Sequence, residues 1–454
     1  MNKKMNDLVN FLKNRGFIYP SSNIYGGLAN SWDFGPLGTM LKINLKNYFN
    51  YFFIDMQENN YYFDSSIILN SKVWEASGHL KKFNDYIITC LNDNQIYRAD
   101  ELLEEYTNYI FENLTILEVE KIIQEKIKLK KYGDKTRWSK ISSFGLMFKT
   151  NYSKTDTKVN EVYFRPETAQ GIFINFKNIS DSLNLKLPFG IGQIGKSFRN
   201  EVTPKNFIFR TKEFEQLELE YFTYKDRAKK DFDKYLKLID LFLLNLGFKK
   251  EDLIKNDIPK NKLAHYAKKT IDYEYNFWFG KKELLGISNR SDFDLKNHSQ
   301  VSKERLQYFD TTSNKWITPH VIEVSMGVER LILAIFNKLF VKEKERNILK
   351  LPFFLSPYKI AICPLTDKLN YQGEELLFNL KKLNIGPIIL QKGGSIGKRY
   401  RKHDEIGTFF IITIDFETEK DQKITIRDRD TKKQERIAIS EIKNYLQTKI
   451  KNIF

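Results

Sequence analysis

Cysteine is scarce in this sequence of 454 residues, which contains only Cys90 and Cys363. Two thiols cannot build a disulfide framework, and such low usage is typical of a reducing compartment, so we expect a cytoplasmic protein. The longest apolar stretches, residues 48–54 and 238–248, fall short of the ~18–20 residues that a membrane helix needs. The N-terminal residues also lack the apolar block of a signal peptide. We therefore expect a soluble protein without a membrane partner.

Histidine is almost as rare, and the five present (positions 79, 265, 298, 320 and 403) form neither an i,i+4 pair nor a cluster with cysteine. This pattern does not favour a zinc site. The sequence also lacks a G-x-S-x-G motif and a recognisable Ser-His-Asp arrangement, which weakens the case for a hydrolase. Two glycine-rich matches are discounted. GIGQIG at 190–195 follows a proline and continues like a strand, while GGSIGK at 393–398 is too short for a phosphate-binding loop.

Positive charge is plentiful, since 74 Lys and Arg residues against 57 Asp and Glu residues give a net charge of +17. An excess of this size favours a polyanionic partner such as nucleic acid. The abundance of Lys, Asn, Ile, Phe and Tyr is also what an AT-rich genome produces. The charge alone therefore leaves both explanations open. The hydrophobic share of 41% indicates a globular chain, and the length predicts two or three domains.

Hydrophobic periodicity predicts an α+β fold. Helical spacing occurs at 37–56 and 328–340, and strand patterns occur at 61–69, 191–202, 207–222, 271–288 and 320–326. Strands and helices do not alternate regularly, so an antiparallel sheet flanked by helices fits best. We expect this domain to span 1–345, with helical insertions at about 100–140 and about 225–270. Residues 346–454 then read as a smaller α/β domain, with strands near 358–364, 387–390, 409–415 and 424–427 and helices near 369–383 and from 440.

Three of the predicted strands carry polar residues at every second position, so each strand should turn one polar face in a common direction. On adjacent strands these faces would form a polar floor made of Arg199, Glu201, Gln216, Glu218, Glu323 and Ser325. Arg330 follows in the next helix, and Lys205, Arg210 and Lys212 lie in the loop between two of the strands. Guanidinium groups suit a triphosphate, and nearby carboxylates suit Mg²⁺. The alternative is that all three faces are merely solvated.

Several longer motifs resemble those of a known protein family. FRNE at 198–201 with FRTKEFEQLELEYF at 209–222 resembles motif 2 of class II aminoacyl-tRNA synthetases, and HVIEVSMGVERLILAIF at 320–336 resembles motif 3. Segments 25–38, 73–79, 97–105, 164–173 and 286–299 resemble glycyl-tRNA synthetases of the single-chain, homodimeric type. Segments 394–410 and 425–431 resemble the anticodon-binding domain of that family. The resemblance implies a class II antiparallel sheet with a C-terminal anticodon-binding α/β domain.

The same resemblance implies roles for individual residues. Arg199, Arg330 and Glu323 would be catalytic. The residues implied for ATP are Arg199, Asn200, Glu201, Phe209, Arg210, Thr211, Lys212, Glu213, Phe214, Glu283, Leu284, Gly327, Val328, Glu329 and Arg330. Those implied for glycine are Arg98, Glu167, Phe214, Glu215, Gln216, Leu217, Glu218, Glu323, Val324, Ser325, Met326 and Gly327. Glu283 and Glu323 would hold the Mg²⁺ that accompanies ATP.

The implied activity is the ATP-dependent formation of glycyl-adenylate and transfer of the glycyl group to the 3′ end of tRNA(Gly), by a homodimer. Zinc is not expected, because the cysteines that many relatives carry at the position of residues 135–145 are absent here. Two other readings stay open. One is an inactive synthetase-like accessory protein that binds nucleic acid, and the other is a class II synthetase for a different amino acid. Ser71, which stands where the family commonly has proline, leaves the strength of the dimer undetermined.

Overall fold

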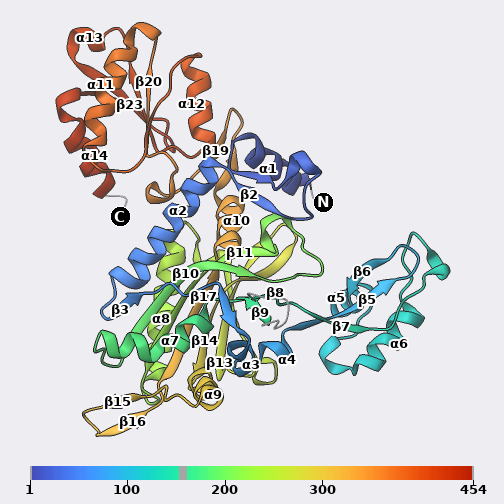
Figure 1. Cartoon of the computed structure of the whole chain (residues 1–454). Coiled ribbons are helices and arrows are strands. Elements are labelled where there is room, and N and C mark those ends of the chain that lie inside the picture. Colours follow the sequence, from blue (N-terminus) through green and yellow to red (C-terminus); the bar gives the residue numbers. More distant parts are fainter. Residues whose placement is uncertain (1–2, 153–160, 452–454) are drawn as a thin grey trace.

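The structure of the protein is a computed structural model, which describes residues 3–152 and 161–451. Its centre is a seven-stranded sheet in the order β12-β13-β14-β17-β11-β10-β3 (Figure 1). All neighbouring strands are antiparallel except β3 and β10, which are parallel. The strands are β3 (Asn60–Tyr62), β10 (Phe189–Phe198), β11 (Glu213–Thr223), β12 (Leu253–Asp257), β13 (Lys269–Phe277), β14 (Gly280–Ser291) and β17 (His320–Gly327).

Alternation along the strands gives this sheet two different faces. Leu217 and Leu219 of β11 and Val324 of β17 are fully buried in the main hydrophobic core on one face. The helices α1 (Lys3–Asn14), α2 (Pro36–Asn50), α8 (Ala228–Asn245) and α10 (Val328–Leu339) contribute to that core. The opposite face carries the polar members of the same strands. Helix α7 (Ala169–Ser182) and helix α9 (Phe293–Ser302) pack toward one end of it. The polar face is therefore only partly covered.

The N-terminal segment wraps around one edge of this body. Helix α1 (Lys3–Asn14) leads into a hairpin of β1 (Ile18–Pro20) and β2 (Trp32–Phe34), with a short 3-10 turn at Asn23–Tyr25 between them. Beyond α2 the helix continues as one π-helical turn, Tyr51–Asp55. The single strand expected at 61–69 is wrong, because two short strands in different sheets, β3 and β4 (Ile68–Asn70), occupy this stretch.

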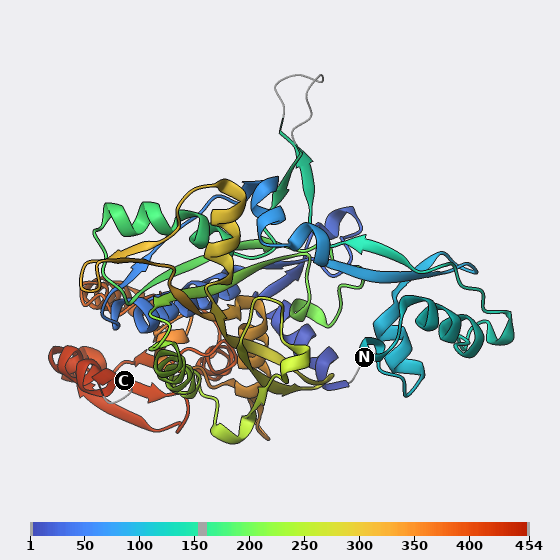
Figure 2. The same ribbon diagram turned by 90° about the horizontal axis from the view of Figure 1, so that it is seen from below.

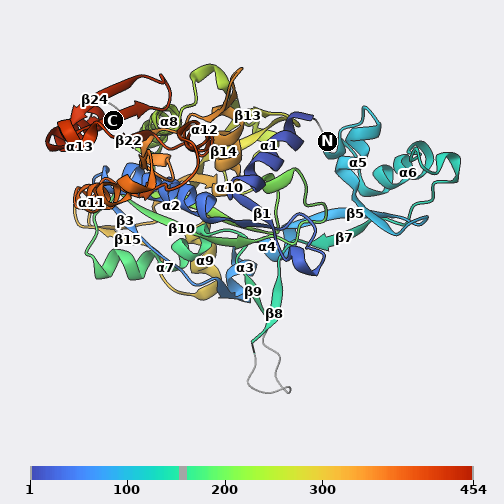
Figure 3. The ribbon, with the colours of Figure 1, turned by 90° about the horizontal axis from the view of Figure 1, so that it is seen from above.

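Residues 84–145 form a projecting unit with a hydrophobic core of its own, built on Ile88, Leu103 and Ile123. Figures 1, 2 and 3 agree that it lies at the opposite end of the molecule from the C-terminal residues. The expected helices within 100–140 are present, but they pack against strands that begin before that range. The unit comprises β5 (Asn84–Cys90), β6 (Gln95–Arg98), α5 (Ala99–Tyr106), α6 (Ile116–Lys126) and β7 (Ser142–Gly145).

The insertion expected at 225–270 is helical only in its first half. Helix α8 packs on the main sheet, and residues 253–257 form the edge strand β12 of that sheet. Smaller elements complete the chain before residue 350: α3 (Ser71–Ala76), α4 (His79–Lys82), β8 (Lys149–Asn151), β9 (Glu161–Phe164), β15 (Tyr308–Asp310), β16 (Lys315–Ile317), β18 (Phe340–Lys342) and β19 (Asn347–Leu349).

The C-terminal part is a five-stranded mixed sheet in the order β21-β20-β22-β23-β24, and the sequence pattern predicts the first four of these strands. Helix α12, which follows the GGSIGK stretch, and strand β24 were not expected. The elements are β20 (Ile360–Pro364), α11 (Asn370–Lys381), β21 (Ile388–Leu390), α12 (Ile396–Glu405), β22 (Phe410–Ile414), α13 (Thr418–Asp421), β23 (Lys423–Asp428), β24 (Gln434–Ala438) and α14 (Ile442–Lys451).

The α+β class, with an antiparallel sheet followed by a smaller α/β unit, is thereby confirmed. The boundary at 345/346 stays a prediction. Residues on both sides of it share the main core, since Leu349, Leu351 and Ile406 are buried there.

Within the described residues, the helices are all too short or too polar to cross a membrane.

Candidate active site

The three predicted polar strands are neighbours, in the order β17-β11-β10. Their register places Glu218 opposite Ser325 and Glu220 opposite Glu323, while Gln216 lies opposite Gly327. Residues directly opposite on neighbouring strands point to the same face, so the polar floor expected from the sequence exists. Arg199 and Glu201 were expected on the strand face, but β10 ends at Phe198 and both residues lie in the loop that follows it.

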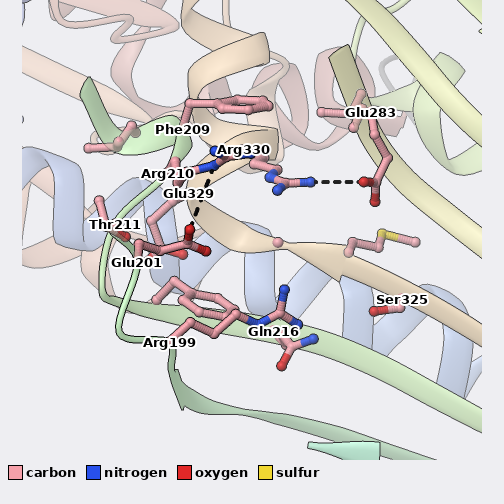
Figure 4. A pocket seen from close by; sticks show the side chains of 15 residues that line it. Arg199, Glu201, Phe209, Arg210, Thr211, Gln216, Glu283, Ser325, Glu329 and Arg330 are labelled. Carbon is pink, nitrogen blue, oxygen red and sulfur yellow. Dashed lines mark ion pairs between the residues drawn. The ribbon is translucent and has the colours of Figure 1, made fainter. Parts of the chain in front are cut away.

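A cavity opens above one end of this floor (Figure 4). It lies between the β10–β11 loop on one side and the ends of β14, β17 and α10 on the other. Its walls therefore combine the two longest family motifs with strand β14. The lining residues are Arg199, Glu201, Ile208, Phe209, Arg210, Thr211, Phe214, Gln216, Glu283, Leu284, Ser325, Met326, Gly327, Glu329 and Arg330.

Two arginines in the cavity are held by aromatic rings. The guanidinium carbon of Arg199 lies 5.2 Å from the ring centre of Phe214 and 5.3 Å from that of Phe83, and Nε donates to the carbonyl of Pro166 at 3.0 Å. Arg330 lies 4.7 Å from the ring centre of Phe209. Cation–π contacts of this kind fix a guanidinium without using up its hydrogen-bond donors. Arg199 in particular keeps donors available for a ligand.

A third arginine approaches from the β10–β11 loop. Nη1 of Arg210 pairs with Glu101 of the projecting unit at 2.7 Å, and its Nε lies 4.0 Å from Glu201. Glu101 also pairs with Lys205 at 2.5 Å. The loop is therefore held against helix α5 by ion pairs, and the cavity mouth carries three guanidinium groups.

The inner end of the floor carries carboxyl groups in place of arginines. Oε1 of Glu218 accepts from Oγ of Ser325 at 3.0 Å and from Nε2 of Gln216 at 2.9 Å, and its other oxygen accepts from Thr168. Glu323 accepts from Arg290 at 2.9 Å. Burial together with the neighbouring charge of Glu167 raises the pKa of Glu218. Burial raises the pKa of Glu323 to about 7, even though Arg290 acts in the opposite direction.

Arg290 is a site residue that the sequence analysis did not assign, although it lies inside the motif at 286–299. Its side chain is 1% exposed and donates to both oxygens of Asp294 at 2.8 and 2.9 Å as well as to Glu323. The ring centre of Tyr266 lies 3.8 Å from its guanidinium carbon. The sequence gives no local pattern for this cluster, because Asp294 and Glu323 are 29 residues apart. Only the folded structure shows that both carboxylates bind the same buried arginine.

Glu167 is half-buried near this end, where its carboxylate lies 3.4 Å from Nε2 of His79 and accepts from Gln170 at 2.9 Å. Close packing explains one of the glycines. A Cβ on Gly195 would lie 2.1 Å from Nη2 of Arg165, so β10 must have glycine where this arginine crosses it. GIGQIG is thus a strand, in agreement with its exclusion as a dinucleotide motif.

Several residues implied by the resemblance lie outside the cavity. Glu215 faces the other side of the sheet and pairs with Lys42 and Lys46, while Leu217 and Val324 are fully buried in the core. These three were carried over as parts of continuous motifs, and strand alternation turns their side chains away from the glycine end. Val328, the first residue of helix α10, is also fully buried. Contacts of these four residues with ATP or glycine stay a prediction, and their side chains lie outside the cavity lining.

The remaining implied residues lie at the periphery. Asn200 accepts from Lys212 at 2.9 Å, and Glu213 pairs with Lys196. Asn200, Lys212 and Glu213 therefore lie on the outer side of the loop. Arg98 is held in the projecting unit by Asp85 at 3.3 Å and by Asp100 at 2.6 Å. Arg98 shares Glu101 with Arg210, and this connects it to the cavity mouth through one carboxylate.

The proposed metal pair does not fit one ion. Glu323 lies opposite Ser288, five residues along β14 from Glu283, which is roughly 16 Å at ~3.3 Å per residue. Glu323 is bound to Arg290, whereas Glu283 lies at the cavity mouth, 3.3 Å from Arg330. Glu274 lies directly opposite Glu283, and Asp272 lies two residues along the same strand. Burial together with the charges of Glu283 and Glu274 raises the pKa of Asp272 to about 7. Within residues 3–152 and 161–451, no three His, Cys, Asp or Glu side chains are gathered closely enough to hold a metal ion.

Comparison with known proteins places this geometry in context. Residues 148–339 match the family model of the tRNA synthetase class II core domain (G, H, P, S and T), and residues 359–449 match that of the anticodon binding domain. The chain is 50% identical to the glycine–tRNA ligase of Mycoplasma mycoides subsp. mycoides, over 99% of both chains. It is 49% identical to that of Mycoplasma capricolum, over 99% of both, and 47% identical to that of Mycoplasmopsis synoviae, over 98% of this chain and 99% of the relative.

Proposed function

The chain belongs to the glycine–tRNA ligase family of class II aminoacyl-tRNA synthetases, and from this premise we propose that it activates glycine with ATP and transfers the glycyl group to tRNA(Gly). The observation that carries the proposal is the arrangement of charged groups along one face of the sheet. Three arginines (Arg199, Arg210 and Arg330) line the cavity. The carboxyls of Glu218 and Glu323 lie outside its lining but on the same face, and Glu218 bonds to the lining residues Gln216 and Ser325. ATP and glycine together have the complementary pattern, with phosphates at one end and an ammonium group at the other.

In the proposed complex, adenine lies at the mouth near Phe214, and the phosphates extend toward Arg330 and Arg210. Glycine lies deeper, with its ammonium facing Glu218 and Ser325. Arg199 lies between the two ends, so its free donors can bind the glycine carboxylate and the α-phosphate at once. Holding both reactants in one orientation removes most of the entropic cost of their encounter.

The first chemical step needs no general base. A carboxylate oxygen of glycine attacks the α-phosphorus of ATP and forms a new O–P bond. The bond from that phosphorus to the bridging oxygen of the β-phosphate breaks, and pyrophosphate leaves. The nucleophile is already ionised, and negative charge builds up on the phosphoryl oxygens, so the arginines contribute by stabilising that charge. In the second step a terminal hydroxyl of tRNA attacks the glycyl carbonyl, and AMP leaves.

Mg²⁺ would accompany ATP, and Glu283, which lines the cavity beside Arg330, would be the carboxylate that holds it at the phosphate end. When bound, the ion would neutralise part of the phosphate charge. The separation described above excludes Glu323 from the same ion, and its proposed role is confined to the glycine end.

The remaining partners follow from other parts of the chain. We assign tRNA contacts to the C-terminal unit, which matches the anticodon-binding model. A homodimer is supported by an exposed apolar tip on the N-terminal hairpin, where Ile24 and Tyr25 are each 86% exposed and Leu28 is 67% exposed. Light scattering of the purified chain tests the dimer. As expected for a synthetase that serves protein synthesis, we place the reaction in the cytoplasm.

Exchange of radioactive pyrophosphate into ATP, measured with each of the twenty amino acids, tests the activity. We expect exchange with glycine and charging of tRNA(Gly). An inactive accessory protein would give no exchange with any amino acid, and a synthetase of other specificity would respond to another amino acid. Either result would contradict the proposal.

A further inference from the structure

The loop that carries Arg210 has an unusual backbone. Asn206 and Phe207 have φ angles of 62° and 59°, in the left-handed region. A bulky aromatic residue rarely adopts this conformation, and such a backbone persists only where the surroundings hold it in place. Phe209 and Arg210 follow directly, so the position of both cavity residues depends on how this turn is held.

The N-terminal hairpin fixes this turn through hydrogen bonds and aromatic packing. Nδ2 of Asn30 donates to the carbonyl of Phe207 at 2.9 Å and to the carbonyl of Arg210 at 2.6 Å. Its Oδ1 accepts from Nε1 of Trp32 at 3.1 Å, and the ring of Trp32 packs edge-on against Phe207 with ring centres 4.6 Å apart. One side chain thus bridges both ends of the short turn that contains Phe209. The two segments lie 177–180 residues apart in sequence.

We propose that Asn30 is a positioning residue for ATP, which acts by fixing the turn 207–210. The turn presents Phe209, which packs against the guanidinium of Arg330, and Arg210, which reaches Glu201 at the cavity mouth. Both arginines are on the phosphate side in the proposed function, on which this inference rests. The glycine end is built on β11 and β17 and on Arg290, and the bonds of Asn30 run instead to the loop.

This role differs from simple support of the N-terminal hairpin. Support alone would lower thermal stability without distinguishing between substrates. A positioning role changes the interaction with ATP and leaves the interaction with glycine unchanged, because only the loop side of the cavity moves.

The substitution Asn30→Asp tests the distinction in the full-length chain. Aspartate has the same shape and tolerates the φ of 48° at this position, but it faces the two carbonyls with an oxygen in place of an N–H donor. Asn30→Gly removes the side chain while still permitting this φ, and serves as the second variant. Asn44→Asp is the matched control. Nδ2 of Asn44 also donates to two carbonyls, those of Leu355 at 3.2 Å and Ser356 at 3.1 Å, away from the cavity.

We expect both Asn30 variants to raise the KM for ATP in glycine-dependent exchange by about tenfold, the size typical of losing a hydrogen bond that leaves its partner unsatisfied. The KM for glycine should stay within about twofold of the wild-type value, and Asn44→Asp should change neither. Unchanged KM for ATP with a lowered melting temperature would overturn the proposal, and so would equal rises in both KM values.

Calorimetric titration of each variant with ATP and Mg²⁺ alone keeps this test independent of the amino acid. A wild-type chain that binds ATP but gives no exchange with glycine would contradict the proposed function. The effect of Asn30 on ATP affinity would still decide the present inference: a weaker affinity in both Asn30 variants supports it, and an unchanged affinity overturns it.

Discussion

Oε1 of Glu218 and Oγ of Ser325 lie 3.0 Å apart on neighbouring strands, and this hydrogen bond closes the inner end of the cavity. Gln216 donates to the same carboxylate oxygen, and Thr168 donates to its other one. Both strands are central in the sheet, so neither residue can shift without disturbing the other. The space that remains is bounded by short, mutually bonded side chains.

This rigidity predicts strong discrimination against alanine without an editing reaction. Every competitor of glycine is larger, and forcing an extra methyl group into tight packing typically costs about 1–3 kcal/mol. Displacing Ser325 or Glu218 would also leave a buried polar group without its bond, which adds a similar amount. We expect kcat/KM for alanine to be lower than that for glycine by about 10³-fold or more. Pyrophosphate exchange measures both values.

Two results would contradict this account of specificity. One is alanine-dependent exchange within about 50-fold of the glycine value. The other is rapid hydrolysis of alanyl-tRNA by the chain, since that would place the discrimination in a separate editing reaction.

Glu220 predicts a specific pH dependence of stability. None of the described residues bonds to either of its carboxylate oxygens, and burial together with the adjacent Glu323 raises its pKa well above the ordinary value. The folded chain therefore keeps a proton that the unfolded chain loses. The free energy of unfolding should fall as pH rises above the unfolded pKa, at up to about 1.4 kcal/mol per pH unit for one such group.

Chemical denaturation of Glu220→Gln between pH 5 and pH 8 measures this contribution. The variant has no proton to lose at this position, so its stability should fall less steeply than that of the wild-type chain. Glu345→Gln, which removes a carboxylate that is 84% exposed, is the control for loss of one charge. Parallel curves for Glu220→Gln and the wild-type chain would show that Glu220 keeps no proton on folding.

The C-terminal unit is expected to bind tRNA through its exposed cations. Lys398 and Arg401 lie exposed on helix α12, within the residues that match the anticodon-binding model. Replacing both with alanine should weaken tRNA binding and reduce the slope of log K against log salt by about 1–2, because fewer counterions are released. Filter binding over a salt series measures the slope, and glycine-dependent exchange should be unchanged. An unaltered slope would remove these two residues from the interface.

Point substitutions are a cleaner test of this unit than truncation near residue 350. Leu351, Leu355 and Ile406 are buried in the main core together with Leu331 of helix α10. A shortened chain would expose this apolar surface, and its loss of activity could not be assigned to tRNA binding.

Periodicity predicted the polar strand faces because side-chain direction in a strand has a fixed period of two. This is why Gln216, Glu218, Glu323 and Ser325 meet as expected. The same rule turns the side chains of Glu215, Leu217 and Val324, which the motifs imply for glycine, to the other face of the sheet. Contacts between segments that are distant in sequence could not be predicted, because they leave no local pattern in the sequence. Arg290 among its carboxylates and Asn30 beneath the 207–210 turn became visible only when the fold brought these residues together.

Arg199 provides the most direct test of the central claim, that glycine and ATP meet in this cavity between the arginines and the glutamates. Its guanidinium is fixed by Phe83, Phe214 and the carbonyl of Pro166, and its remaining donors are free for the reacting groups. Glycine-dependent pyrophosphate exchange should be compared between the wild-type chain and Arg199→Ala, with melting temperature and oligomeric state as checks on folding. We predict a loss of about 10²–10³-fold in rate with the fold intact. An exchange rate within about threefold of wild type would contradict the account.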